Sequence, residues 1–152
     1  MSLHKKIQDD LTSALKAGDG FRVGVLRMLS SSLHNRSIEK KGKGQDTELT
    51  DEEALEILGR EAKKRKEAAE LYEKGGRSDL SAKEKQEFIL VKAYLPEDVG
   101  DEEIGKVIEG VLANMGKVTQ KEFGKVMGEV MKQLKGRADA SAVSALVKKR
   151  LQ

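Results

Sequence analysis

Apolar residues recur at three- and four-residue intervals along most of the chain, which is the spacing of amphipathic α-helices. The first run covers residues 3 to about 17, behind Ser2 as a possible N-cap, and it ends at Gly18 and Gly20. A second run covers residues 21 to about 40 and places valine and leucine on one face. The pattern therefore predicts two consecutive helices, the second of them central to the core.

Capping boxes predict where the next two helices begin. Residues 41–46 have the glycine and polar content of a mobile loop, and the Thr50-to-Glu53 box after them opens a third helix. That helix is expected to run to the Gly75-Gly76 pair. A second box, Ser81 to Glu84, is expected to open a fourth helix, which Pro96 ends.

The segment around Pro96 is the predicted domain boundary, because proline disfavours helical geometry in the residue before it. Three shorter apolar stripes follow, within residues 104–115, 123–134 and 143–151. Thr119 to Glu122 forms another capping box, and Asp139 can cap the last helix. The sequence thus predicts an all-α fold, with an N-terminal four-helix unit over residues 1–96 and a C-terminal three-helix unit over residues 97–152.

Composition narrows the chemistry that such a fold can carry. Aromatic residues make up 3% of the chain and charged residues 36%, which favours solvated helices over sheet. The chain has no cysteine, which excludes disulfides, thiolate zinc sites and cysteine nucleophiles. Its two histidines, His4 and His34, do not form a metal-ligand pattern, and no phosphate loop, nucleophile elbow or kinase signature is present. We therefore expect no catalytic centre, metal or cofactor of its own, and a function in binding.

The N-terminal residues enter an amphipathic pattern directly, and no long apolar span is present. We therefore expect a protein that neither is secreted nor spans a membrane. A reducing, cytoplasmic location fits these features.

Positive charge is concentrated at the C-terminal end of the sequence. The net charge is +3, and residues 1–100 carry 19 Lys/Arg and 19 Asp/Glu. Residues 117–152 carry 9 Lys/Arg against 3 Asp/Glu, a net of +6. This distribution points to the last helices as a surface for an anionic partner.

The predicted sixth helix combines positive charge with glycine. One stripe of this helix contains Lys121, Lys125, Gly128, Lys132 and Lys135. Gly124 lies beside it, and each glycine within a helix costs roughly 1 kcal/mol relative to alanine. Two glycines in one turn indicate a close approach to the backbone, either by another helix or by a sugar-phosphate chain held by the lysines. Arg137, in the turn that follows, can bind a phosphate with two parallel hydrogen bonds.

Two other polar groups of residues have simpler interpretations. On the second helix Arg27, Ser31, His34 and Asn35 share one face, which we interpret as solvated. The third helix carries a basic run, residues 60–66, with glutamates at four-residue spacing. This pattern is typical of a salt-bridged surface helix.

Several motifs resemble the GatB/YqeY family over essentially the whole chain. They are Val25-Leu26-Arg27-Met28-Leu29, Lys64-Arg65-Lys66-Glu67-Ala68, Tyr94-Leu95-Pro96, Gly124-Lys125-Val126-Met127-Gly128 and Lys135-Gly136-Arg137-Ala138-Asp139. The chain closely resembles the freestanding YqeY-like members. The last third is also similar to the tail domain of the GatB component of the aspartyl/glutamyl-tRNA amidotransferase.

The resemblance implies a two-part helical protein linked to tRNA, because the amidotransferase tail reaches the outer corner of its tRNA. It places Lys125, Lys132, Lys135 and Arg137 as candidate RNA contacts. The family usually has glycine after the Ala-Asp pair where this chain has Ala140, which puts a contact near the start of the last helix in doubt. Only the amidotransferase tail is matched, so transamidation by this chain alone is not supported.

The leading hypothesis is a tRNA-associated accessory module that reads shape and phosphate position, with no DNA partner expected. Four phosphate contacts would give a log–log salt slope of roughly minus three. One alternative is a protein-interaction module that docks on an amidotransferase or another translation component without binding RNA. Another is a component of a glutamine-dependent carbon-nitrogen ligase that acts only within a complex.

Overall fold

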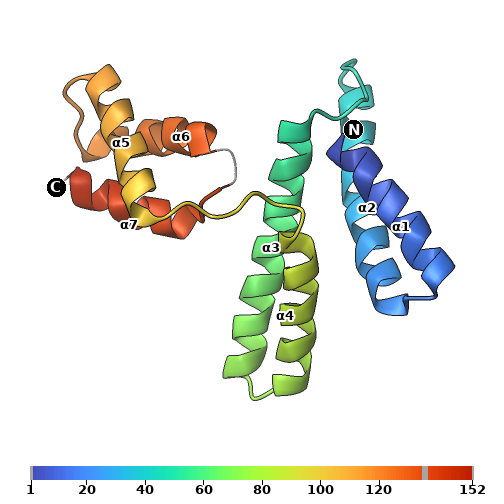
Figure 1. The fold of residues 1–152 in the computed structure, drawn as a ribbon. Helices are drawn as coiled ribbons and strands as arrows, with labels where there is room; N and C mark the ends of the chain where they lie inside the picture. The colour runs from blue at the N-terminus through green and yellow to red at the C-terminus, as the bar shows by residue number, and fades with distance from the viewer. Residues whose placement is uncertain (1, 135–136, 152) are drawn as a thin grey trace. The chain divides into compact units, whose positions relative to one another are not determined.

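The computed structural model describes residues 2–134 and 137–151, and every regular element in those ranges is a helix (Figure 1). This confirms the all-α prediction. The chain divides into two compact units, Met1–Leu95 and Pro96–Gln152. None of the helices within the described ranges is long and apolar enough to cross a membrane.

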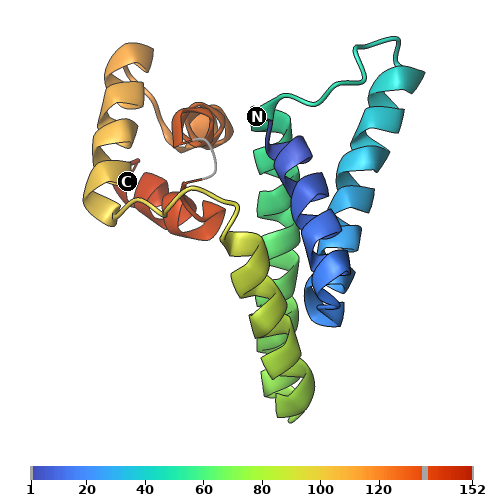
Figure 2. The same cartoon turned by 45° about the vertical axis from the view of Figure 1, so that its right-hand side comes forward.

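Unit 1 consists of two antiparallel helical hairpins (Figures 1 and 2). Its helices are α1 (Leu3–Ala17), α2 (Gly20–Gly42), α3 (Asp51–Lys74) and α4 (Ser78–Lys92). The Ser2 side chain accepts a hydrogen bond from the Lys5 amide, and Gly18 ends α1 in the left-handed region at φ 70°. The predicted start and end of the first helix are therefore confirmed.

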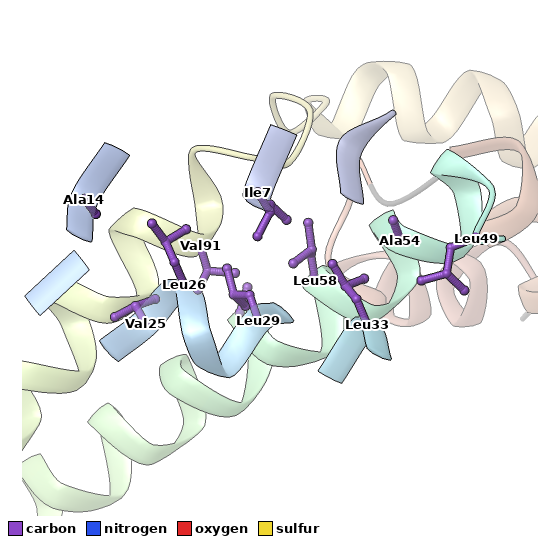
Figure 3. Packing of buried hydrophobic residues seen from close by; sticks show 11 residues of the cluster. Ile7, Ala14, Val25, Leu26, Leu29, Leu33, Leu49, Ala54, Leu58 and Val91 are labelled. Carbon is purple, nitrogen blue, oxygen red and sulfur yellow. The ribbon is translucent and has the colours of Figure 1, made fainter. Parts of the chain in front are cut away.

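Figure 3 shows the core of unit 1, where side chains from all four helices point toward one another. Leu26 and Leu29 of α2 are fully buried, as are Ile7 of α1, Leu58 of α3 and Val91 of α4. Burying one such side chain stabilises the fold by about 1.5–3 kcal/mol. The second helix thus supplies the centre of this core, as its apolar face predicts.

The start of α4 differs from the prediction. Ser81 does not cap the helix, which begins three residues earlier at Ser78. Ser81 is fully buried, and its hydroxyl donates to the Ala69 carbonyl of α3 at 2.9 Å. Gly76, at φ 75°, reverses the chain so tightly that α4 begins almost at once and no separate loop precedes Ser81. The capping prediction is wrong because the Ser81 hydroxyl joins two helices and does not cap the start of one.

A buried lysine organises the connection between α2 and α3. The α2 helix continues to Gly42, so the first two residues of the predicted loop are helical. Lys40 is 8% exposed, and its ammonium donates to the Glu48 carbonyl and to the Glu53 carboxylate, both at 2.8 Å. Glu53 also accepts from the Thr50 amide, which completes the predicted capping box. One carboxylate therefore fastens the end of α2 to the start of α3.

This arrangement predicts a pH-dependent contribution to stability. The hydrogen bond from Lys40 is the main reason why the pKa of Glu53 lies below its usual 4.5. A carboxyl whose pKa is lowered on folding stabilises the fold above its unfolded pKa, and this contribution disappears as the pH falls through the folded value. We expect Glu53→Gln to lower the free energy of unfolding by about 1 kcal/mol at pH 7. Urea unfolding at pH 7 and pH 3 should show this difference shrinking in acid.

Glu70→Gln is the control for this prediction, because Glu70 is an exposed glutamate on the same helix. It should change stability little at either pH. If Glu53→Gln lowers the free energy of unfolding equally at pH 3 and pH 7, the charge on Glu53 does not contribute to stability.

Unit 2 is a bundle in which three α-helices pack on one another. It contains α5 (Asp101–Met115), the short 3-10 helix η1 (Gln120–Glu122), α6 (Phe123–Leu134) and α7 (Ala140–Arg150). Ile108 of α5, Val126 and Val130 of α6 and Val143 and Val147 of α7 are completely buried. The three apolar stripes seen in the sequence therefore form one core.

The ends of the unit 2 helices follow the predicted caps in part. The Glu122 carboxylate accepts from the Thr119 amide at 2.7 Å, and the Thr119 hydroxyl accepts from the Lys121 amide at 3.3 Å. This capping box opens η1, which leads directly into α6. Asp139 occupies the N-cap position of α7, but its side chain makes no capping hydrogen bond.

Candidate functional site

The side of α6 that faces away from the core carries the lysines predicted to bind RNA. Val126, Val130 and Leu134 are fully buried. Lys125 and Lys132, seven residues apart, are exposed on the other side of the helix. Together with two glycines on that side and a lysine of η1, they form what we name the basic face: Lys121, Gly124, Lys125, Gly128 and Lys132.

The lysines of the basic face form no ion pair within the described residues, although the charge of Lys125 contributes to the lowered pKa of Glu122. There, no carboxylate lies within 4.0 Å of the ammonium groups of Lys121, Lys125 or Lys132. Glu122, the acid before α6, is held in its capping box, and the hydrogen bond from Thr119 is the main cause of its lowered pKa. Glu129 is exposed at the edge of the face and is the one acid within α6. The face is therefore open to an external anion.

The glycines of the basic face leave the backbone of α6 uncovered. A Cβ atom added to Gly124 or Gly128 would have no described heavy atom within 4 Å. Among the described residues of unit 2, no other helix packs against these positions. The helices of unit 2 therefore do not supply the close approach, and contact with a sugar-phosphate chain stays a prediction.

Arg137 is engaged within unit 2. Its backbone carbonyl accepts from the Val99 amide at 2.7 Å, and its Nε donates to the Leu134 carbonyl at 3.3 Å. Its guanidinium lies 3.6 Å from the Glu103 carboxylate of α5. The Arg137 side chain is 40% exposed and has further N–H groups, so it can bind a phosphate beside Glu103, and this contact stays a prediction. The predicted contact Lys135 lies outside the described residues.

A buried ionic cluster in unit 1 was not predicted from the sequence. Glu61 of α3 accepts from the Ser32 hydroxyl of α2 at 3.1 Å and from Arg65 Nη1 at 2.6 Å. The Arg65 side chain is 12% exposed, contacts the Met28 sulfur and lies 3.8 Å from Glu87 of α4. Arg65 Nε has no hydrogen-bond partner among the described residues. The cluster joins three helices, and only the Glu61–Arg65 spacing is visible as a helical pattern in the sequence.

The remaining polar groups that the sequence analysis singled out on α2 and α3 are exposed. Arg60 pairs with Glu56 at 2.5 Å and Lys63 with Glu67 at 3.8 Å, which confirms a salt-bridged outer face on α3. On α2 the Arg27, Ser31, His34 and Asn35 stripe is exposed throughout, in agreement with the interpretation as a solvated face. In the described ranges, no three His, Asp or Glu side chains come together as a metal site.

Tyr94, from the Tyr94-Leu95-Pro96 motif, fastens the end of unit 1. Its hydroxyl donates to the Asp10 carboxylate of α1 at 2.5 Å, and the Lys6 ammonium lies 5.7 Å from the centre of its ring. Burial, followed by the hydrogen bond to Asp10, raises the pKa of Tyr94 far above its usual value. The phenol therefore remains a neutral hydrogen-bond donor, which is a structural role.

The chain is therefore an all-α protein of two helical units, the second of which carries the basic face. The family described as Yqey-like protein matches residues 4–151, and the chain belongs to this YqeY-like family.

Three fungal relatives carry the name altered inheritance of mitochondria protein 41, mitochondrial. The protein of Vanderwaltozyma polyspora is 28% identical over 79% of this chain and 66% of its own length. The protein of Pyrenophora tritici-repentis is 26% identical over 91% of this chain and 75% of its own length. The protein of Lachancea thermotolerans is 33% identical over 59% of this chain and 46% of its own length. The chain thus spans about two thirds of the length of the Vanderwaltozyma polyspora protein. Since the relatives are named as mitochondrial, the predicted cytoplasmic location stays a prediction.

Proposed function

We propose that this protein is a tRNA-associated accessory module that binds the sugar-phosphate backbone through the basic face of α6. The observation that carries the proposal is that Lys121, Lys125 and Lys132 are exposed around two uncovered glycines and have no described carboxylate within 4.0 Å. When ammonium groups of this kind bind phosphates, condensed counterions are released from the nucleic acid, and this release favours binding entropically.

Binding of this type positions the RNA without reading its base sequence. Phosphate contacts fix register and orientation, whereas base edges carry the sequence information. The family membership and the resemblance of the last third to the amidotransferase tail support tRNA as the RNA in question. We take the cytoplasm as the compartment, and the mitochondrial names of the relatives make an organelle that contains tRNA the other choice.

Direct binding measurements test the proposal. Purified protein is titrated with total tRNA and with a DNA duplex of matched length, over a salt series from about 50 to 200 mM. We expect tighter binding to tRNA, with a log–log salt slope of about minus three for three to four phosphate contacts. Equal affinity for DNA and tRNA would reduce the interaction to general charge attraction, and no binding at the lowest salt would contradict the proposal.

Exposed apolar side chains favour one second candidate, a protein-interaction module. Leu71 of α3 is 67% exposed and Ile89 of α4 is 68% exposed, on two helices that pack against each other. They suit a partner such as an amidotransferase or another translation protein. Capture of such a partner at a salt concentration that releases tRNA, with loss of capture in Leu71→Lys, would support this candidate.

A role as one component of a glutamine-dependent carbon-nitrogen ligase follows from the family resemblance alone. An amidation assay on mischarged tRNA, with and without added protein, tests it. Amide formation that depends on the added protein would support this role.

A further inference from the structure

The basic face has no aromatic side chain, and this restricts the form of nucleic acid that it can bind. Phe123 is the only aromatic residue between Pro96 and Gln152. Its ring packs against the core of unit 2, and the Lys148 ammonium lies 5.7 Å from the ring centre. Proteins that hold single strands usually stack the bases on aromatic side chains. The basic face offers no such platform, so unpaired bases would find little to bind there.

The shape of the face suits a paired stem better. Lys125 and Lys132 are separated by about 10 Å along the helix axis, since an α-helix rises about 1.5 Å per residue, and they can therefore reach different phosphates. Between them, Gly128 has open space at its missing Cβ, and so has Gly124 one turn earlier. The result is a low, flat strip of backbone bordered by cations.

Such a strip has a chemical counterpart in double-stranded RNA. The A-form minor groove is wide and shallow and displays the ribose 2′-hydroxyls. A helical carbonyl keeps a second lone pair after its hydrogen bond within the helix, so it can still accept from a hydroxyl. Backbone that no side chain covers is the part of α6 that could receive a 2′-hydroxyl, which DNA lacks.

We propose that the basic face of α6 binds a double-stranded A-form RNA stem across its minor groove. In this arrangement Lys125 and Lys132 bind phosphates, and the backbone at Gly124 and Gly128 lies against the riboses. The inference rests on the proposed function and specifies its ligand as a paired stem, not a loop or a free end.

Three probes of equal length test the choice of ligand: an RNA duplex, the DNA duplex of the same sequence and one of the RNA strands alone. We expect the RNA duplex to bind at least tenfold more tightly than either of the others. Tighter binding of the single strand, or equal binding of the two duplexes, would overturn the inference.

The double variant Gly124→Ala/Gly128→Ala tests the glycines directly. Alanine favours a helix more than glycine does, and both positions have room for a Cβ, so the variant should melt no lower than wild type. We expect its affinity for the RNA duplex to fall at least fivefold, with the salt slope unchanged because the lysines remain. Gly110→Ala is the matched control, since Gly110 is an exposed glycine in α5 whose Cβ position is equally open.

The outcomes separate this inference from the proposed function. If wild type binds tRNA with the expected salt slope and the glycine variant binds the RNA duplex as wild type does, the groove contact is wrong and the tRNA role stands. If wild type binds neither tRNA nor the RNA duplex, the proposed function itself has failed, and a protein partner becomes the occupant of the face.

Discussion

The double variant Lys125→Glu/Lys132→Glu should bind tRNA at least thirtyfold more weakly than wild type at about 50 mM salt. Both side chains are exposed on α6 and form no ion pair among the described residues, so their replacement removes only a longer-range attraction between Lys125 and Glu122. Each reversal removes one phosphate contact and adds a repulsive charge, and the log–log salt slope should become shallower by about two. Fluorescence anisotropy across a salt series measures both quantities.

The matched control is Lys83→Glu/Lys85→Glu, which makes the same change of net charge on α4 of unit 1. This control should bind tRNA nearly as well as wild type. Both variants should keep the helical circular dichroism of wild type and melt within a few degrees of it. Equal loss of affinity in the two variants would mean that net charge, and not the basic face, determines binding.

Glu61→Ala should lower the free energy of unfolding by about 2–3 kcal/mol, because it removes the carboxylate at 2.6 Å from the buried Arg65 and leaves only Glu87, at 3.8 Å, as a charged partner. The Ser32 hydroxyl loses its acceptor in the same change. The side chains of Glu61 and Arg65 are 10% and 12% exposed, so water can replace these contacts only in part. Urea unfolding followed by circular dichroism gives the difference.

Lys64→Ala is the control for the Arg65 cluster. Lys64 lies 3.4 Å from the same Glu61 carboxylate, but its side chain is 68% exposed. Its removal should cost less than about 0.5 kcal/mol, the usual value of an exposed pair. If Glu61→Ala costs no more than Lys64→Ala, Arg65 has found a sufficient partner in Glu87, 3.8 Å away.

Local sequence patterns predicted the helices well, because helix formation depends on spacing and capping over a few residues. The Thr50 and Thr119 boxes are found where the sequence places them, and apolar periodicity identified both cores. The Ser81 box failed because the same Ser-x-x-Glu pattern also fits a buried hydroxyl inside a helix. Only the close packing of α3 and α4 distinguishes the two cases.

The candidate site was likewise predictable where it depends on local spacing and not where it depends on tertiary packing. The positions of Lys125 and Lys132 on the outer side of α6 follow from periodicity and were predictable. The engagement of Arg137 with Glu103 and Val99 depends on tertiary packing, which the sequence does not reveal. The Arg65 cluster was missed for the same reason, since Ser32 and Glu87 lie on other helices.

The hydrogen bond between Tyr94 and Asp10 joins residues 84 positions apart, so the first helix and the last residues of unit 1 are fastened together. During synthesis the α1 helix leaves the ribosome early, yet this partner becomes available only when nearly the whole unit has emerged. Domains generally fold as units, the N-terminal one first. Unit 1 should therefore complete its packing late in its own synthesis but before the basic C-terminal segment has been made, which leaves that segment to fold after unit 1 is complete.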